Sequence, residues 1–331
     1  MWMPIRISAL FTSIIFSASA ATQGVDLPAR FVADRVFVEP VTRDGKTLHM
    51  YTDSGGGANM LCRDAASRLG LVTTPAPADE ELGENVAYAH FPVFQARSGI
   101  PANADGDDRW LVHDCKTGTI WDELGDGFLS NRWFAGRIWT WNYPKQQLRL
   151  EAPNWKAAKA AARVPLGFPI NAKGERADNF ARITIRVDGK PIDMLLDTGA
   201  TTTLTPEAVT ALSDNLPATR ATSMIVDAQF QAWHRAHTDW RVIEQAQAGS
   251  KASMIEVPDV EIAGAHVGPL WFTWRPDKNF HEFMSNMMDK QVEGAIGGNA
   301  FSHFVMTIDY PRAVAYFRCT RDCKATPRSA P

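Results

Sequence analysis

The sequence predicts a mostly β protein built from two related lobes, and two observations carry this prediction. An acidic loop occurs twice, as Asp-Ser-Gly-Gly at 53–56 and as Asp-Thr-Gly-Ala at 197–200. An Asp-Gly-Lys turn stands nine residues before each aspartate, at 44–46 and at 188–190. A turn, a strand and an acidic loop in one shared register indicate an internal duplication, so we expect one lobe from each copy.

The segments that follow the two acidic loops also correspond. Gly-Ala-Ile-Gly-Gly-Asn-Ala-Phe at 294–301 is followed by Val-Met-Thr-Ile-Asp-Tyr-Pro at 305–311, which predicts a strand and a turn. In the first half, Leu-Gly-Asp-Gly-Phe at 124–128 and Ile-Trp-Thr-Trp-Asn-Tyr-Pro at 138–144 come in the same order. The duplication therefore extends well beyond the two loops.

The residue types of the loops predict hydrolytic chemistry. Two carboxylates held face to face cannot both ionise easily, so Asp53 and Asp197 are expected to share a proton. One carboxylate then serves as general base for a water, and the other as general acid for the leaving group. This predicts hydrolysis of peptide bonds without a metal or a covalent intermediate. We expect the hydroxyl groups of Ser54 and Thr198 to lock the two loops together, and Gly55 and Gly199 to permit the tight turns.

The paired loops and the segments at 294–301 and 305–311 resemble the signatures of aspartic proteases, most closely bacterial retropepsin-like proteins with two lobes in one chain. The resemblance implies a bilobal acid-protease fold, with two β-barrel-like lobes and a cleft between them. It implies no cofactor, and a peptide or protein substrate. It also implies a hairpin of the first lobe that covers the cleft as a flap, with Tyr88 or Phe91 on it; an ordinary surface hairpin is the alternative.

The first copy departs from the family pattern at two positions. Thr52 stands where an apolar residue normally precedes the aspartate, and Glu123 interrupts the apolar pair expected before Gly125. These departures motivate an alternative to the endopeptidase, namely a catalytically inactive secreted protein that binds peptides or proteins on the same fold. Gly56 and Ala200 follow the two Asp-x-Gly triplets without a hydroxyl group, which predicts a mildly acidic to neutral pH optimum.

Composition and the N-terminal segment indicate the compartment. The chain has 331 residues and a net charge of −3, so nothing favours nucleic acid or an anionic membrane as a partner. Residues 1–20 resemble a secretory signal peptide, with an uncleaved anchor as the alternative, and we expect a secreted or periplasmic protein without stable membrane insertion. Two copies in one chain remove the need for a dimer, so a monomer is expected.

The four cysteines fit an oxidising compartment. Of the three possible pairings, the most local one joins Cys62 to Cys115 and Cys319 to Cys323. His234 and His237 have the spacing of a metal-binding pair, but solvent-facing histidines are the preferred interpretation because no thiol or acidic partner stands at a recognisable spacing.

The remaining elements follow from periodicity and turn residues. The lobe boundary is placed near residue 160, which gives lobes over 21–160 and 161–331. Thr205 and Pro206 are suited to the cap and first turn of a helix. In chain order we expect strands within 30–52, a helix over 62–71, a strand or hairpin arm over 86–94, one or two helical turns over 155–162, a helix over 206–212, two strands over 257–272 with a turn at Gly264, and a helix over 279–289.

Overall fold

The computed structural model describes residues 24–77, 86–115 and 124–325, and its regular structure is mostly β-strand. The predicted signal peptide at 1–20 lies outside the described residues. The sheet of the first lobe has eight strands in the order β2 (Ala29–Val32), β3 (Arg35–Val38), β4 (Met50–Thr52), β9 (Gly127–Leu129), β5 (Met60–Cys62), β8 (Arg109–His113), β7 (Ala87–His90) and β6 (Thr73–Pro75).

The sheet of the second lobe is larger. Its ten strands run in the order β18 (Val242–Ile243), β19 (Met254–Val257), β22 (Leu270–Arg275), β17 (Ser223–Val226), β23 (Gly294–Ile296), β14 (Lys190–Leu196), β13 (Arg182–Val187), β20 (Val260–Ile262), β21 (Ala265–Val267) and β26 (Lys324–Ala325). A separate pair, β15 (Thr201–Thr203) and β16 (Thr219–Ala221), follows the second acidic loop. Within the described ranges neither large sheet closes on itself, so the lobes expected to be barrel-like are open sheets.

The strand pairing repeats between the two lobes. In the first lobe β4 runs parallel to β9, β9 antiparallel to β5, and β5 parallel to β8. In the second lobe β14 runs parallel to β23, β23 antiparallel to β17, and β17 parallel to β22. The same three steps in the same order confirm the predicted mostly β fold with two related lobes.

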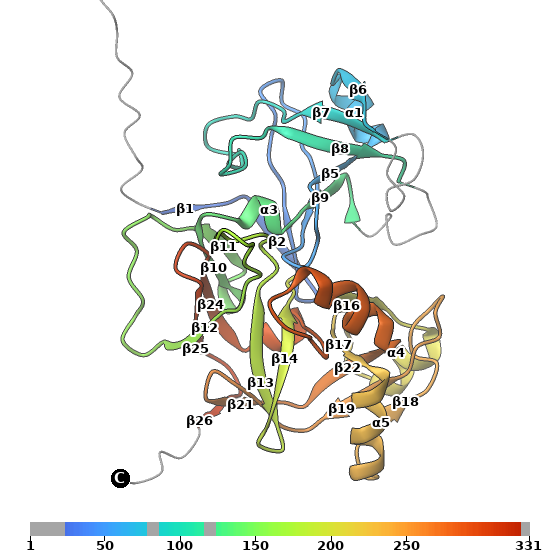
Figure 1. The fold of residues 1–331 in the computed structure, drawn as a ribbon. Helices are drawn as coiled ribbons and strands as arrows, with labels where there is room; N and C mark the ends of the chain where they lie inside the picture. Colours follow the sequence, from blue (N-terminus) through green and yellow to red (C-terminus); the bar gives the residue numbers. More distant parts are fainter. Residues whose placement is uncertain (1–23, 78–85, 116–123, 326–331) are drawn as a thin grey trace, which may run out of the picture.

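A third sheet joins the two copies. Its order is β1 (Val25–Asp26), β11 (Gln147–Leu150), β10 (Ile138–Asn142), β24 (Phe304–Asp309), β25 (Val314–Cys319) and β12 (Ala162–Pro165), so a strand of each half meets at its centre. Thr140 on β10 lies opposite Thr307 on β24, and their hydroxyl oxygens are 2.8 Å apart. Figure 1 shows this sheet beside the first-lobe sheet at the top and the second-lobe sheet at the bottom.

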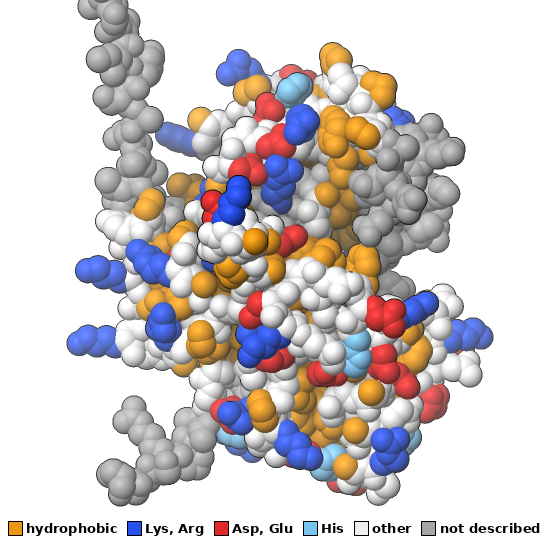
Figure 2. Space-filling view, viewed as in Figure 1, with side chains coloured by type: hydrophobic (Ala, Val, Ile, Leu, Met, Phe, Trp, Pro, Cys, Tyr) orange, Lys and Arg blue, Asp and Glu red, His pale blue; other side chains and the backbone are white. Residues whose placement is uncertain are grey.

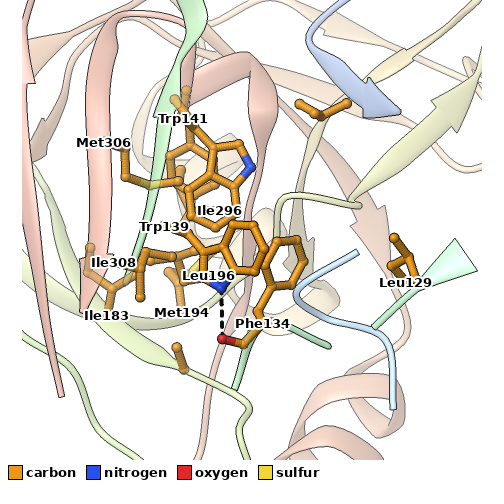
Figure 3. Close-up of a cluster of buried hydrophobic side chains, with 14 of the residues drawn as sticks. Leu129, Phe134, Trp139, Trp141, Ile183, Met194, Leu196, Ile296, Met306 and Ile308 are labelled. Atoms are coloured by element: carbon orange, nitrogen blue, oxygen red, sulfur yellow. Dashed lines mark hydrogen bonds between the residues drawn. The ribbon is translucent and has the colours of Figure 1, made fainter. Parts of the chain in front are cut away.

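One buried cluster holds the strand ends in place. Trp139 and Trp141 from the central sheet are fully buried with Leu196 and Ile296 from the second lobe. Figure 3 shows these side chains packed together, with the indole N–H of Trp139 donating to the carbonyl of Phe134 at 2.9 Å. Because a close-packed core yields little to displacement, this cluster fixes the strand that precedes the second acidic loop.

Several predicted elements are confirmed. The helices expected over 62–71 and 206–212 are present as α1 (Arg63–Leu69) and α4 (Pro206–Leu212). The described ranges also contain three helices that were not predicted, α3 (Asn131–Phe134), α5 (Asp227–Ala236) and α6 (Gly298–Phe301). The Thr205 hydroxyl caps α4 by accepting from the Ala208 N–H at 3.2 Å, as expected. Both predicted disulfides, Cys62–Cys115 and Cys319–Cys323, are present, which agrees with an oxidising compartment.

Two predicted helices are wrong. Residues 155–162 form turns and the start of β12 rather than helical turns. Residues 279–289 contain a π turn at Asn279–Phe283 and a 3-10 turn at Met284–Met287 instead of an α-helix. The hydroxyl of Ser285 donates to the Phe280 carbonyl and accepts from the Val292 N–H, which competes with regular helical bonding.

The visible surface carries both signs of charge. Figure 2 shows lysine and arginine side chains interspersed with aspartate and glutamate over both lobes, rather than gathered in one field. In the described part of the chain, no helix is long and apolar enough to cross a membrane.

Candidate active site

Each acidic loop starts where a central strand ends. The N–H of Asp53 donates to the carbonyl of Leu129 at 2.8 Å, and the N–H of Asp197 donates to the carbonyl of Ile296 at 3.0 Å. Leu129 pairs with Thr52 just as Ile296 pairs with Leu196. The parallel neighbours β9 and β23 therefore hold the two aspartates in equivalent ways.

This pairing corrects the register proposed for the first copy. The apolar pair equivalent to Ala295 and Ile296 is Phe128 and Leu129, and not the residues before Gly125. Glu123 lies outside the described residues and does not belong to the apolar pair of the first copy. The prediction that Glu123 interrupts this pair was wrong, because it aligned the residues before Gly125 with Ala295 and Ile296.

Thr52, the other departure, is accommodated by the fold. Its side chain is fully buried, and its hydroxyl donates to the carbonyl of Val36 at 2.8 Å. A buried hydroxyl that has a partner costs little. Thr52 therefore ties the strand before Asp53 to its neighbour β3, and does not loosen it.

Ser54 and Thr198 bind the two loops to each other. The Ser54 hydroxyl donates to the carbonyl of Leu196 at 2.9 Å and accepts from the N–H of Thr198 at 2.9 Å. In return, the Thr198 hydroxyl accepts from the N–H of Ser54 at 3.2 Å. Both side chains are almost completely buried, so these bonds form away from competing water.

The glycines allow the loops to approach closely. A Cβ atom at Gly55 would overlap the carboxyl group of Asp197, and a Cβ at Gly199 would overlap that of Asp53. Neither glycine has a positive φ. Glycine is therefore needed at these positions because each faces the carboxyl group of the other copy, and not for the turn itself.

The two carboxyl groups face each other within hydrogen-bonding reach. The N–H of Gly55 donates to Asp53 Oδ1 and the N–H of Gly199 donates to Asp197 Oδ1, both at 2.8 Å. Both aspartates lie deep in the molecule but retain some accessible surface. Burial raises the pKa of Asp53, and burial together with the neighbouring Asp53 raises the pKa of Asp197 well above its ordinary value. The pair therefore holds one proton more readily than two separate carboxylates would.

Tyr51 is a site residue that the sequence reasoning did not assign. Its hydroxyl donates to the carbonyl of Gly199 at 2.9 Å and lies 2.6 Å from the hydroxyl of Thr201. The only sequence signal is that a tyrosine stands two residues before Asp53 where the second copy has Leu195.

The structure places the two suggested flap residues on β7 and just after it. Phe91 packs edge-on against Trp110 and Phe94, with ring centroids 4.5 and 5.1 Å away. The guanidinium of Arg109 lies over the ring of Tyr88 at 5.2 Å. Both rings are thus engaged within the first lobe, and a flap role for either stays a prediction.

No cluster of three or more potential metal ligands occurs among residues 24–77, 86–115 and 124–325. His237 bonds to Asp188 at 2.7 Å and stacks on Trp240, while His234 is exposed. The solvent-facing interpretation is therefore confirmed for His234 and wrong for His237, which is half-buried and has an acidic partner.

No family model matches the chain, and no curated protein matches it. Among solved structures 397 chains match, and one of them is the basic 7S globulin from soybean. That match has 10% sequence identity and a TM-score of 0.46, over 90% of this chain and 95% of the globulin. A likeness this distant says nothing about the function of this chain.

The assignment to bacterial retropepsin-like proteins is wrong. It rested on paired motifs, and neither a family model nor a curated protein supports it. The sequence of a short acidic loop reflects the local requirements of a facing carboxyl pair, and similar sites occur in proteins of different function.

Proposed function

We propose that the chain is an aspartic endopeptidase in which Asp53 and Asp197 activate a water for peptide-bond hydrolysis. The observation that carries this proposal is the pair of facing carboxyl groups inside the reciprocal lock of Ser54 and Thr198. Such a lock keeps two like-charged groups together although they repel each other when both are ionised. A binding cleft has no need for this arrangement, whereas proton-sharing catalysis depends on it.

The mechanism follows from the shared proton. Burial raises the pKa of both aspartates, so the resting pair keeps one proton, which we write on Asp197, and the two groups titrate together. Ionised Asp53 takes a proton from the water as its oxygen bonds to the substrate carbonyl carbon. Protonated Asp197 donates to the carbonyl oxygen, which becomes a gem-diol hydroxyl. When the C–N bond breaks, Asp53 gives its proton to the departing amine and Asp197 takes one from a gem-diol hydroxyl, so the pair regains its starting state.

The pH–rate profile tests this mechanism. Cleavage of an unfolded protein by the mature chain is expected to follow a bell, because only the singly protonated pair is active. Hydroxylamine added during the reaction should trap no acyl product, since water attacks directly. A hydroxamate product would contradict the proposal, because it would require a covalent acyl intermediate.

A second candidate is a peptide- or protein-binding protein that does not cleave its ligand. A cavity of about 660 Å³ favours it, lined in part by Met224, Phe280 and Met284 with Arg275 and Lys278, and by neither aspartate. A cavity that combines apolar side chains with a few charged ones, here Arg275, Lys278 and Glu282, can hold an extended chain without chemistry. This candidate predicts that folded wild-type protein cleaves nothing at any pH, yet binds unfolded polypeptide in calorimetry with an affinity unchanged by Asp197→Asn.

We further propose that the protein acts outside the cytoplasm as a monomer, with lobes over 21–160 and 161–331. The two disulfides support the location. The pairing of β10 with β24, which joins the two halves within one chain, supports the monomer. The substrate would be a peptide or protein rather than nucleic acid.

A further inference from the structure

The hydroxyl group of Tyr51 crosses from the strand of one acidic loop to the other loop. Tyr51 lies on β4, two residues before Asp53, and is 2% exposed. A hydroxyl has one proton, so donation to the Gly199 carbonyl leaves its lone pairs to accept from the Thr201 hydroxyl. The matching position of the second copy is Leu195, which offers no such bond. Only the second loop is therefore held in this way.

The bond to Gly199 acts on the residue whose own N–H serves Asp197. The N–H of Gly199 donates to Asp197 Oδ1 at 2.8 Å, which lowers the pKa of that carboxyl group. A donor on the Gly199 carbonyl oxygen fixes this residue, and with it the direction in which its N–H points at the carboxylate. The bond made by Tyr51 thus acts, through one residue, on the dyad, the facing carboxyl pair of Asp53 and Asp197.

We propose that Tyr51 is a positioning residue for the dyad, which fixes the second acidic loop at Gly199 and keeps the Gly199 N–H bonded to the Asp197 carboxylate. The consequence for catalysis rests on the proposed function. The consequence for titration of the carboxyl pair does not, because it concerns only the folded protein.

The surroundings keep Tyr51 a donor. Burial and the nearby charge of Asp53 raise the pKa of Tyr51 far above its ordinary value, so the hydroxyl stays protonated. The charged and titratable groups that face it are Asp53, Asp197 and Arg35, the last of which lies over the ring of Phe37. Tyr143 also lies within electrostatic range of Asp197 and Tyr51, and burial keeps it neutral.

The first test replaces Tyr51 by phenylalanine in the full mature chain. Carbon-13 NMR of labelled aspartate follows the titration of the dyad directly, with signals assigned through Asp53→Asn and Asp197→Asn. We expect the higher apparent pKa of the pair to rise by about 0.2 to 0.6 units in Tyr51→Phe. The descending limb of the pH–rate profile should move to higher pH by the same amount, with kcat more affected than KM.

The matched control is Tyr143→Phe. The buried hydroxyl of Tyr143 has no hydrogen-bond partner among the described residues, so this variant should leave the titration of the pair and the pH–rate profile unchanged.

The second test preserves the fold if Tyr51→Phe does not. Site-specific 3-fluorotyrosine at position 51 makes the hydroxyl a stronger donor with little change of shape, so the pKa of the pair should fall rather than rise. Opposite shifts for the two substitutions, or the fall alone, support the proposal. An unchanged pKa in folded Tyr51→Phe or fluorotyrosine protein overturns it, even if stability changes. If wild-type protein cleaves nothing but these shifts occur, the proposed function fails and the positioning role stands.

Discussion

Ser54 and Thr198, which are 144 residues apart, each accept the other's backbone N–H through a side-chain oxygen. The two bonds cross between the acidic loops, and Ser54 adds a third to the carbonyl of Leu196. The aspartates that precede these residues in the chain are thereby brought face to face. The account of function depends on this relationship, because two carboxyl groups share a proton only while something holds them together.

Replacing Ser54 by alanine should weaken this lock. The substitution removes two buried hydrogen bonds to the second loop, so we expect a loss of about 2–3 kcal/mol in the free energy of unfolding together with lower cleavage activity. Urea denaturation measures the first effect. Ser54→Thr is the matched control, because it restores the hydroxyl that the second copy carries, and it should recover most of the stability. Equal stability of Ser54→Ala and wild type would contradict the reciprocal lock.

Replacing Gly199 by alanine should separate the carboxyl groups. Its new Cβ would overlap the carboxyl group of Asp53, so that the loops must move apart. A displacement of about 1 Å at a reacting group costs on the order of a hundredfold in rate. Gly57→Ala is the control, since its Cβ would lie 3.7 Å from the nearest Phe180 atom, an ordinary contact. The comparison of kcat/KM for the two variants is the measurement, and similar values would argue against close approach of the loops.

The raised pKa values predict how stability depends on pH. The folded pair retains a proton that the unfolded chain releases, because the pKa of both aspartates is raised in the folded state. The stability that this proton contributes is fully present below the unfolded value of about 3.9 and is lost as the pH rises through the folded values. The double variant Asp53→Asn/Asp197→Asn lacks the proton and should lose less stability over that range. Chemical denaturation of both proteins from pH 4 upward compares the slopes, and parallel curves would refute the raised values.

The sequence predicted the duplication, and it predicted that Asp53 pairs with Asp197, because both predictions depend on local patterns. Asp53 and Asp197 follow equivalent turns and strands, and a repeated register is visible without a structure. The pairing of the first copy was misplaced because Gly125, Asp126 and Gly127 allow several alignments. Only the contact of β9 with β4 selects Phe128 and Leu129 as the apolar pair.

Other features depend on contacts between distant segments. Tyr51 bonds to Gly199, 148 residues away, so no local pattern could reveal its role. The segment over 279–289 has helical periodicity, yet the side chain of Ser285 takes backbone partners at Phe280 and Val292. The family assignment failed for a related reason, since the motifs describe a local loop and not the ancestry of the whole chain.

The central claim is that both aspartates are needed for hydrolysis. The most direct test measures cleavage of an unfolded protein by purified wild type, Asp53→Asn and Asp197→Asn across pH. Asp178→Asn serves as the control, because burial also raises the pKa of Asp178 although it bonds to Asn131 and not to the dyad. We predict that each dyad variant loses about a thousandfold in rate or more, whereas Asp178→Asn stays active. Cleavage that survives in folded Asp53→Asn would contradict the account, because the first acidic loop would then take no part in the chemistry.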